Sequence, residues 1–363
     1  MKIGIIGCGS ICNAYFNGSK IFPMLEIAAC ADIRQDAAVA KAAEFKVTAM
    51  SVEKLLADPE IGMVINLTIP KAHAEITLNA LNAGKHVYSE KPLAITREEG
   101  RLIQETAKTR KLRVGCAPDT FLGGGQQTCR KLLDDGWLGR PVAGTAFMLC
   151  HGPERWHPNP AFFYQKGAGP MFDMGPYYVT SLVHMLGPVR RVAAITGASL
   201  KERIAECKEH YGERLPVEIP THYSGTLEFH NGALVTMVIS FDVWAHGHAP
   251  IEIYGSNASL QVPDPNSFGG VPRLKNRDMK EWQDQCLSHG YSENTRSIGA
   301  ADMVCAIQAN RPHRCGLSLA NHILDVMHSF EESSVTRQAV EIKTTCDRPA
   351  PLPLGLIPGQ VDL

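Results

Sequence analysis

The sequence lacks the features that mark membrane, disulfide-stabilised and nucleic-acid-binding proteins. No apolar run among the 363 residues is long enough to cross a bilayer, and no two of the eleven cysteines form a Cys-x-x-Cys pair. Neither sign of charge is in excess: 36 Lys and Arg stand against 37 Asp and Glu, for a net charge of −1. This balance gives no bulk attraction to DNA or to an anionic membrane. We therefore expect a cytoplasmic protein with reduced thiols and with neither nucleic acid nor membrane as a partner.

A secretory signal and a metal-ligand spacing are also absent from the sequence. The run IGIIGCGS at residues 3–10 is too short and too rich in glycine for a secretory apolar region. Cys8 and Cys12 lie four residues apart, which suits small residues packing at a turn better than ligands of a metal. His151 and His157 are candidate zinc ligands, but no third ligand follows at a recognisable spacing. We predict no metal site.

The first 120 residues alternate short apolar runs with helical patterns. Strands are predicted at 2–7, 25–32, 47–49, 62–70, 86–90 and 111–117, and helices at 10–20, 33–45, 51–59, 71–84 and 96–110. Alternation of this kind predicts a parallel, doubly wound sheet of the Rossmann type. Because 363 residues exceed the usual size of one core, we predict two domains, a Rossmann-type domain at 1–120 and a second domain at 121–363.

The second domain has the pattern of an α+β fold with a large, mostly antiparallel open sheet. Apolar and polar residues alternate through 221–242 around an Asn231–Gly232 turn, and a second hairpin is predicted at 250–262. Helical patterns follow at 294–309 and 317–335, and the proline-rich stretch 347–359 is expected to run extended along the surface. An exposed face of such a sheet would suit a homodimer or homotetramer.

A dinucleotide fingerprint follows the first predicted strand. Gly7 permits a tight turn, and Gly9 lets backbone amides approach a pyrophosphate at the start of a helix. The third position of the fingerprint holds Cys12, where glycine or alanine is usual, but cysteine is small enough to fit. Ser10 and Ile11, between these positions, are expected to contact the cofactor.

An acidic residue ends the second predicted strand. Asp32 lies where a carboxylate accepts the ribose hydroxyls of NAD, and its charge disfavours the extra phosphate of NADP. Arg34, two residues on, is also a candidate contact and would weaken that preference. The alternative is that Asp32 only caps the following helix. We predict NAD as the cofactor, with NADP less favoured.

A charged pair, Glu90–Lys91, ends the fifth predicted strand and is followed by Pro92. Carboxyl ends of parallel strands share one edge of the sheet, so this pair is expected beside Gly9 and Asp32. Pro92 restricts Lys91 to extended geometry, which aims its side chain. The alternative is a solvated turn. Three residues that end the fourth strand and start its helix are expected beside the nicotinamide, namely Thr68, Pro70 and His73.

These motifs together resemble the glucose–fructose oxidoreductase, inositol dehydrogenase and rhizopine catabolism protein family (Gfo/Idh/MocA). The resemblance rests on Gly-x-Gly, the acid after the second strand, TIPKAH at 68–73 and EKP at 90–92, and it covers the whole chain. It implies NAD(P)-dependent redox chemistry at a secondary alcohol or ketone of a sugar, a cyclitol or a related small molecule, with Lys91 beside the reacting carbinol.

The family's second signature is a helix that carries an aspartate and, four residues later, a histidine. Asp173 matches the aspartate, whereas Tyr177 occupies the histidine position, where a phenol is able to relay a proton. The resemblance implies that Lys91 is the base where desolvation lowers its pKa, that Tyr177 shares the proton relay, and that Asp173 orients the substrate or the lysine. Pro176 is expected to kink or restart this helix.

The stretch 150–167 before that helix combines hydrogen-bonding and aromatic side chains. As a loop over the nicotinamide, it would offer a sugar the ring of Trp156 together with His151 and His157. The alternative is a dimer contact or a packed surface loop. The sequence therefore predicts an NAD-dependent sugar, glycoside or cyclitol dehydrogenase. Two other functions remain open: a lyase or glycosidase that oxidises its substrate transiently, and a non-catalytic regulator that senses a dinucleotide.

Overall fold

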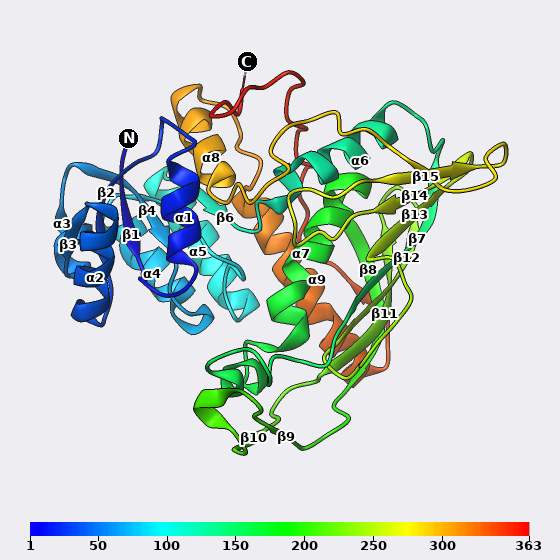
Figure 1. The fold of residues 1–363 in the computed structure, drawn as a ribbon, viewed down its shortest axis with the longest axis horizontal. Coiled ribbons are helices and arrows are strands. Elements are labelled where there is room, and N and C mark those ends of the chain that lie inside the picture. The colour runs from blue at the N-terminus through cyan, green and yellow to red at the C-terminus, as the bar shows by residue number, and fades with distance from the viewer. Residues whose placement is uncertain (363) are drawn as a thin grey trace.

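The computed structural model describes residues 1–362. Its first domain is a six-stranded parallel sheet with helices on both faces (Figure 1). The strand order is β3-β2-β1-β4-β5-β6, with every neighbouring pair parallel. In chain order its elements are β1 (Lys2–Ile6), α1 (Cys12–Ser19), β2 (Glu26–Ala31), α2 (Gln35–Phe45), β3 (Thr48–Met50), α3 (Val52–Ala57), β4 (Ile61–Asn66), α4 (Pro70–Asn82), β5 (His86–Ser89), α5 (Arg97–Arg110) and β6 (Val114–Cys116). The predicted doubly wound sheet is confirmed.

Local sequence signals set the ends of these helices. Ser51 caps α3, its hydroxyl accepting the amide of Lys54 at 3.3 Å. Thr96 and Glu99 form a reciprocal capping box at the start of α5. Gly84 follows α4 with φ of +79°, a backbone conformation that glycine adopts without strain. Each signal turns the chain back toward the sheet, so that the strand ends gather at one edge.

The second domain is built on a nine-stranded sheet with the order β16-β15-β14-β13-β7-β12-β11-β8-β17. All of its neighbours are antiparallel except the parallel pair β7 and β12. Its strands are β7 (Pro141–Leu149), β8 (Val189–Gly197), β11 (His222–Phe229), β12 (Leu234–Ser240), β13 (Ile251–Gly255), β14 (Ala258–Val262), β15 (Arg273–Asn276), β16 (Gln283–Asp284) and β17 (Val340–Glu341); β9 (Glu202–Ile204) and β10 (Arg214–Pro216) pair separately.

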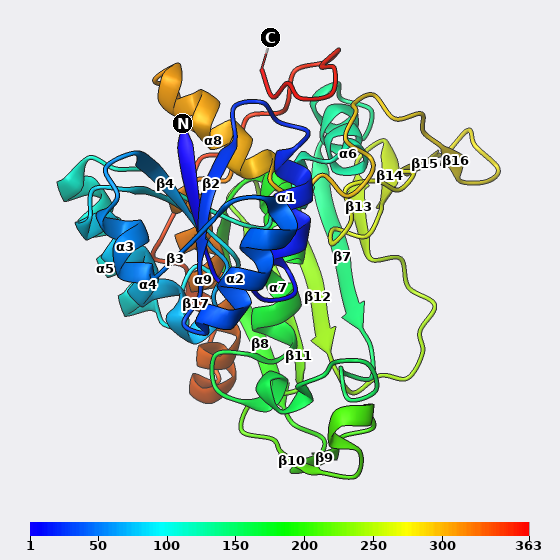
Figure 2. The same ribbon diagram turned by 60° about the vertical axis from the view of Figure 1, so that its left-hand side comes forward.

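Helices cover only one face of this large sheet. The helical elements of this part of the chain are η1 (Thr120–Leu122), α6 (Gly124–Asp134), η2 (Pro160–Tyr164), α7 (Gly169–Leu186), η3 (Lys208–His210), α8 (Ile298–Gln308) and α9 (Leu317–Thr336). Tyr223 and Leu227 of β11 point to the covered face and are fully buried, as their alternation predicts. Figure 2 shows α7 standing between the two sheets. The opposite face of the large sheet is left open.

After β16 the chain returns to the first domain. Helix α8 packs beside β6 and α1, and Gly115 and Gly316 form an isolated bridge. The segment after β17 has no further helix or strand in the described residues, but it is anchored rather than loose on the surface, since Leu352 and Val361 are buried. Among residues 1–362, no helix combines the length and apolar character needed to cross a membrane. The domain boundary at residue 120 stays a prediction.

Candidate active site

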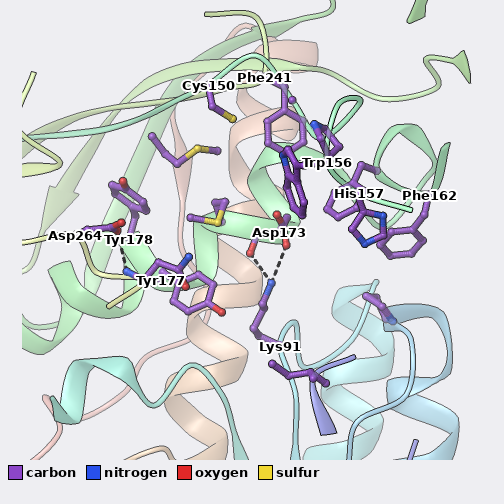
Figure 3. Close-up of a pocket in the computed structure, with 18 of the residues that line it drawn as sticks. Lys91, Cys150, Trp156, His157, Phe162, Asp173, Tyr177, Tyr178, Phe241 and Asp264 are labelled. Carbon is purple, nitrogen blue, oxygen red and sulfur yellow. Dashed lines mark hydrogen bonds and ion pairs between the residues drawn. The ribbon is translucent and has the colours of Figure 1, made fainter. Parts of the chain in front are cut away.

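A cavity of about 920 Å³ lies where the carboxyl ends of the first sheet face α7 and β7 of the second domain. The first domain contributes the Gly-loop residues Ser10 and Ile11, the β4 loop and the Glu90–Lys91 turn. The second domain contributes α7, the last three residues of β7 and the loop at 150–163. Figure 3 shows Lys91 reaching up to Asp173 in the middle of this space, with Trp156 on one side and Asp264 on the other.

Lys91 is held by the second domain and does not lie in a solvated turn. Its Nζ donates to Asp173 Oδ1 and to the Asp173 backbone carbonyl, both at 2.8 Å. The same Nζ lies 5.2 Å from the centre of the Tyr177 ring. The lysine side chain is 15% exposed and the Asp173 side chain 29%. One ion pair thus joins the EKP turn of the first domain to helix α7 of the second.

The condition for Lys91 to act as a neutral base is not met in this structure. Burial alone would lower the pKa of Lys91, but the charges of Asp173, Tyr177 and Glu90 more than offset it and raise the pKa above its ordinary value. Desolvation therefore does not decide the charge state of Lys91. At neutral pH the group is an ammonium, a hydrogen-bond donor and a proton source.

Helix α7 presents Asp173 and Tyr177 one turn apart, as the spacing predicts. The helix does not restart at Pro176, because it runs from Gly169 to Leu186 with the proline inside it; the expected kink stays a prediction. Pro176 has no amide to offer the Phe172 carbonyl. The next carbonyl along, that of Asp173, accepts the Lys91 ammonium. Pro176 therefore lies in the part of α7 whose backbone carbonyl at Asp173 contacts Lys91.

Glu90 pairs with a residue that sequence reasoning did not single out. Its Oε1 accepts the Tyr15 hydroxyl at 2.9 Å and Arg296 Nη1 at 3.2 Å, and its Oε2 accepts the Lys91 amide at 3.0 Å. Burial would raise the pKa of Glu90, but Arg296 and Lys91 outweigh burial and lower it. Glu90 is 6% exposed, so it fixes the turn from beneath the cavity. No pattern near Arg296 signals this role.

His73 joins the two loops that follow β4 and β5. Its Nδ1 lies 2.7 Å from the Pro92 carbonyl, and its Nε2 lies 2.9 Å from the Thr68 carbonyl. Burial lowers the pKa of His73 despite these two acceptors. Asn66, also missed by sequence reasoning, accepts the Thr68 hydroxyl at 2.7 Å. Pro70, at the first turn of α4, and Thr68 line the cavity beside them.

The glycine turn after β1 fits a dinucleotide. Gly7 has φ of +103°, and a Cβ there would lie 2.5 Å from the backbone of Leu67. A Cβ on Gly9 would meet no protein atom within 4 Å, so the space beside Gly9 is open to a pyrophosphate. Burial raises the pKa of the Cys12 thiol to about 11, which makes it a packing residue.

Asp32 holds the glycine turn through two backbone amides. Its Oδ2 accepts the Cys8 amide at 2.7 Å and its Oδ1 accepts the Arg34 amide at 2.9 Å. The capping alternative does not hold, because Arg34 occupies the N-cap position of α2. Arg34 itself is exposed. Together Gly9 and Asp32 supply the open backbone and the acceptor that NAD requires.

The loop at 150–163 brings two of its three predicted sugar contacts to the cavity. Trp156, 68% exposed, and His157 line it. His151 does not, because its ring stacks on Trp244 with centroids 3.4 Å apart. The zinc alternative is also not supported, since His157 Nδ1 accepts the Asn159 amide at 3.0 Å. Further aromatic side chains line the same cavity: Phe162 and Phe163 from this loop, and Phe147, Tyr178 and Phe241 from elsewhere in the chain.

A buried arginine fastens this loop to the sheet. Arg203 Nη1 donates to Glu154 at 3.1 Å, and Arg203 Nη2 donates to the Phe241 carbonyl at 2.9 Å and also to Asp242. Arg203 and Glu154 are 3% and 4% exposed. Buried charges of this kind are costly unless they are paired, so the pairing fixes where the loop lies.

Two models of one protein family match the chain. Residues 1–117 match the oxidoreductase family with the NAD-binding Rossmann fold, and residues 126–261 match the GFO/IDH/MocA C-terminal domain. The chain belongs to the Gfo/Idh/MocA family. It is therefore an NAD-binding oxidoreductase, as the glycine turn, the EKP motif and Asp173 together predicted.

Individual members of the family are similar at low identity. Levoglucosan dehydrogenase of Pseudarthrobacter phenanthrenivorans is 23% identical over 289 residues, which are 72% of this chain and 73% of that protein. The 1,5-anhydro-D-fructose reductase of Ensifer adhaerens is 25% identical over 264 residues, 72% of this chain and 77% of that protein. A solved structure of levoglucosan dehydrogenase with NADH matches with a TM-score of 0.80 at 20% identity, covering 95% of this chain and 99% of that one.

Proposed function

We propose that this protein is an NAD-dependent dehydrogenase that transfers hydride between nicotinamide and a secondary alcohol or ketone of a sugar, glycoside or cyclitol. The observation that carries the proposal is the Lys91–Asp173 pair, 2.8 Å apart, at the edge of the dinucleotide crevice and inside the cavity. Relatives named for levoglucosan, 1,5-anhydro-D-fructose and D-glucosides support a sugar as the substrate.

Ketone reduction and alcohol oxidation require different protonation states of Lys91. Bound NAD supplies the acceptor or donor of the hydride. For ketone reduction, Lys91 gives its proton to the carbonyl oxygen, and its raised pKa keeps that proton in place at neutral pH. For alcohol oxidation, Lys91 must first lose its proton before it accepts the one from the hydroxyl. In this proposal Asp173 holds the ammonium toward the reacting oxygen, and Tyr177, whose ring centre lies 5.2 Å from Lys91 Nζ, shares the proton.

A carbohydrate-like substrate fits the walls better than an apolar alcohol does. Asp173 and His157 offer partners to hydroxyl groups, and Trp156 offers a flat ring to the C–H face of a pyranose. An apolar alcohol would leave those polar groups unpaired when buried, at about 1–3 kcal/mol each. Lys91 is paired with Asp173 and Arg296 with Glu90, so neither cation requires an anionic substrate.

The deciding experiment is NAD reduction followed by absorbance, across pyranoses, glycosides, inositols and aliphatic alcohols. We expect turnover with at least one polyol, and we expect Lys91→Met to abolish it while NAD binding stays nearly intact, because Lys91 lies away from the pyrophosphate. Aliphatic alcohols outperforming every polyol would contradict the substrate class. Near-normal activity of Lys91→Met would remove the catalytic role of the lysine. Net release of NADH also separates a dehydrogenase from a lyase that recycles its cofactor and from a dinucleotide sensor.

We also propose a homodimer or homotetramer that uses the open face of the large sheet. Ile195 on β8 is 77% exposed and Leu234 on β12 is 50% exposed. Apolar side chains on an uncovered sheet face are typical of an interface. Light scattering should therefore give a mass above that of one chain, and the double variant Ile195→Lys with Leu234→Lys should shift it toward one. A wild-type mass of a single chain would refute this.

A cytoplasmic location is proposed on the state of the cysteines. All eleven lie among the described residues as free thiols, and Cys150 and Cys286 are exposed. Exposed unpaired thiols persist in a reducing compartment. Fractionation of the native host should place the protein in the soluble reducing fraction.

A further inference from the structure

The active-site cavity has a neighbour on the side away from Trp156. A groove of about 350 Å³ is lined by residues 266–270, by residues 292–294 and by Arg296. Asn266 and Arg296 line both this groove and the main cavity, so the two spaces meet at these side chains. Figure 3 shows Asp264 at this end of the cavity, with Lys91 between it and Trp156. Sites for small molecules begin at about this size, roughly 300 Å³.

The groove is held in place by the start of α6. A Cβ on Gly123 or Gly125 would lie 2.2–2.3 Å from the carbonyl oxygens of Phe268 and Gly269, and only glycine permits that approach. The amide of Gly125 donates to the Phe268 carbonyl at 3.1 Å. The amide of Gly124 donates to the Tyr291 carbonyl at 3.2 Å. Both walls of the groove are therefore fixed on one helix.

Arg296 stands where the two spaces meet, with hydrogen-bonding capacity left over. It is 8% exposed, and its Nη1 donates to Glu90 at 3.2 Å. Its Nε is buried without a partner, and no described residue accepts from Nη2. A guanidinium carries five N–H groups in a fixed fork. A buried donor left unpaired is costly, so Arg296 favours a ligand that brings acceptor oxygens.

The charges around Arg296 decide what kind of ligand fits. Glu90 already neutralises the guanidinium, and the remaining charged groups at this end, Asp264 in the cavity and Glu293 in the groove, are both carboxylates. A phosphate or carboxylate would meet net repulsion there. A neutral hydroxyl-bearing group instead donates to the carboxylates and accepts from Arg296.

We propose that the groove is a second sugar subsite and that the preferred substrate is a disaccharide or glycoside whose second unit is an uncharged, hydroxyl-rich ring. This inference rests on the proposed function. The first ring lies at Lys91 and Asp173, and the second ring passes Arg296 toward Ser292 and Glu293. Arg296 is then a specificity-determining residue that donates to the oxygens near the linkage.

The test compares substrates and variants in the full chain. The best monosaccharide from the polyol screen is assayed as its methyl glycoside, as a set of disaccharides and as its glycosyl phosphate. We expect at least one disaccharide to exceed the methyl glycoside in kcat/KM by about tenfold, mainly through KM, and the phosphate to fall below both. Two variants should bring the ratio of kcat/KM for the disaccharide to kcat/KM for the methyl glycoside close to one. Ser292→Trp fills the groove from an exposed position, and Glu293→Ala removes a carboxylate that lines it.

Controls separate failure of this inference from failure of the proposed function. Glu281→Ala removes an exposed glutamate outside the groove and should leave the ratio unchanged. Arg296→Lys keeps the charge opposite Glu90 but removes the fork, and should lower the ratio if it folds. Equal efficiency for all disaccharides and the methyl glycoside, or a ratio unaffected by Ser292→Trp, would overturn the subsite while leaving the dehydrogenase intact. If none of the sugars supports NAD reduction, the proposed function is overturned, and the subsite with it.

Discussion

Asp173 is the residue that most directly sets the chemistry of Lys91. Burial by itself favours the neutral amine, and the carboxylate 2.8 Å away reverses that preference. The pKa of Lys91 is raised in the folded state, so its ion pair contributes its full stabilisation at any pH below the unfolded lysine pKa of about 10.4. That contribution is lost as the pH rises through the pKa of the folded state. The activity of the site should follow the same proton.

The first prediction tests this control. Oxidation of the best polyol should still be rising at pH 10 in the wild type, because Lys91 must lose its proton first. In Asp173→Asn the rise should move to lower pH by about 1–3 units, since one nearby opposite charge is worth that much. The measurements are kcat/KM against pH and, as a readout independent of turnover, the pH dependence of Lys91 labelling by an amine reagent. An unmoved profile in both would show that Asp173 does not hold the proton on Lys91.

The second prediction concerns Asp32 and cofactor choice. Asp32→Ala should reduce the ratio of kcat/KM with NAD to that with NADP, because the charge that repels the 2′-phosphate is gone. Asp32 also holds the amides of Cys8 and Arg34, so the alanine variant loosens the turn as well. Asp32→Asn keeps an acceptor and removes only the charge. If the charge decides, both variants lower the ratio; a fall in the alanine variant alone would assign the effect to the turn.

Single residues were predictable where the local sequence defines their place. Gly7, Gly9 and Lys91 each follow a strand, and strand ends of a parallel sheet share one edge. Arg296 was not predictable, because 206 residues separate it from Glu90 and nothing near it marks the pairing. His151 was misplaced for a related reason, since its stacking partner Trp244 lies on another loop.

At the scale of elements, periodicity gives the faces of strands but not their neighbours. The alternation in β11 and β12 was sufficient to predict a hairpin with one buried face. It was not sufficient to predict that β12 also pairs in parallel with β7, because that register depends on the third dimension of the fold. That α7 does not restart at Pro176 was not predictable for a similar reason. A lost helix bond costs about 3 kcal/mol in isolation, and burial of almost every residue of α7 holds the helix together regardless.

The third prediction uses α7 to separate packing from chemistry. Tyr177 is 5% exposed, so Tyr177→Phe keeps the buried ring and removes only the hydroxyl. Turnover should fall by about 10²–10⁴-fold if the phenol takes part in proton transfer, with a much smaller change in KM. Tyr177→His should keep partial activity, because an imidazole also relays protons. An unchanged kcat in Tyr177→Phe would make Tyr177 a packing residue.

At the scale of the whole molecule, the site exists only where the two domains meet. Lys91 comes from the turn after β5 and Asp173 from α7, so their distance depends on how the domains are held. Arg97 at the start of α5 provides the most extensive polar tie to α9. Its Nε donates to Asp325 at 2.7 Å, its Nη2 to Ser329 at 2.8 Å and its Nη1 to Glu332 at 2.6 Å.

The fourth prediction is that the contacts of Arg97 with α9 keep Lys91 and Asp173 correctly placed, although Arg97 is not itself in the active site. Arg97→Ala leaves the buried carboxylate of Asp325 without its cation, although the Lys343 and Thr344 amides still donate to it. Arg97 is itself 40% exposed, which reduces the loss. We expect the free energy of unfolding to fall by about 1–3 kcal/mol, and kcat/KM to fall while the NAD dissociation constant stays the same, because Lys91 and Asp173 are no longer held in register. Arg101→Ala is the matched control, since Arg101 lies one turn along the same helix with only exposed partners. Equal effects of the two substitutions on melting temperature and kcat/KM would mean that the Arg97 contacts do not hold α5 to α9, and that the position of Lys91 does not depend on this ion pair.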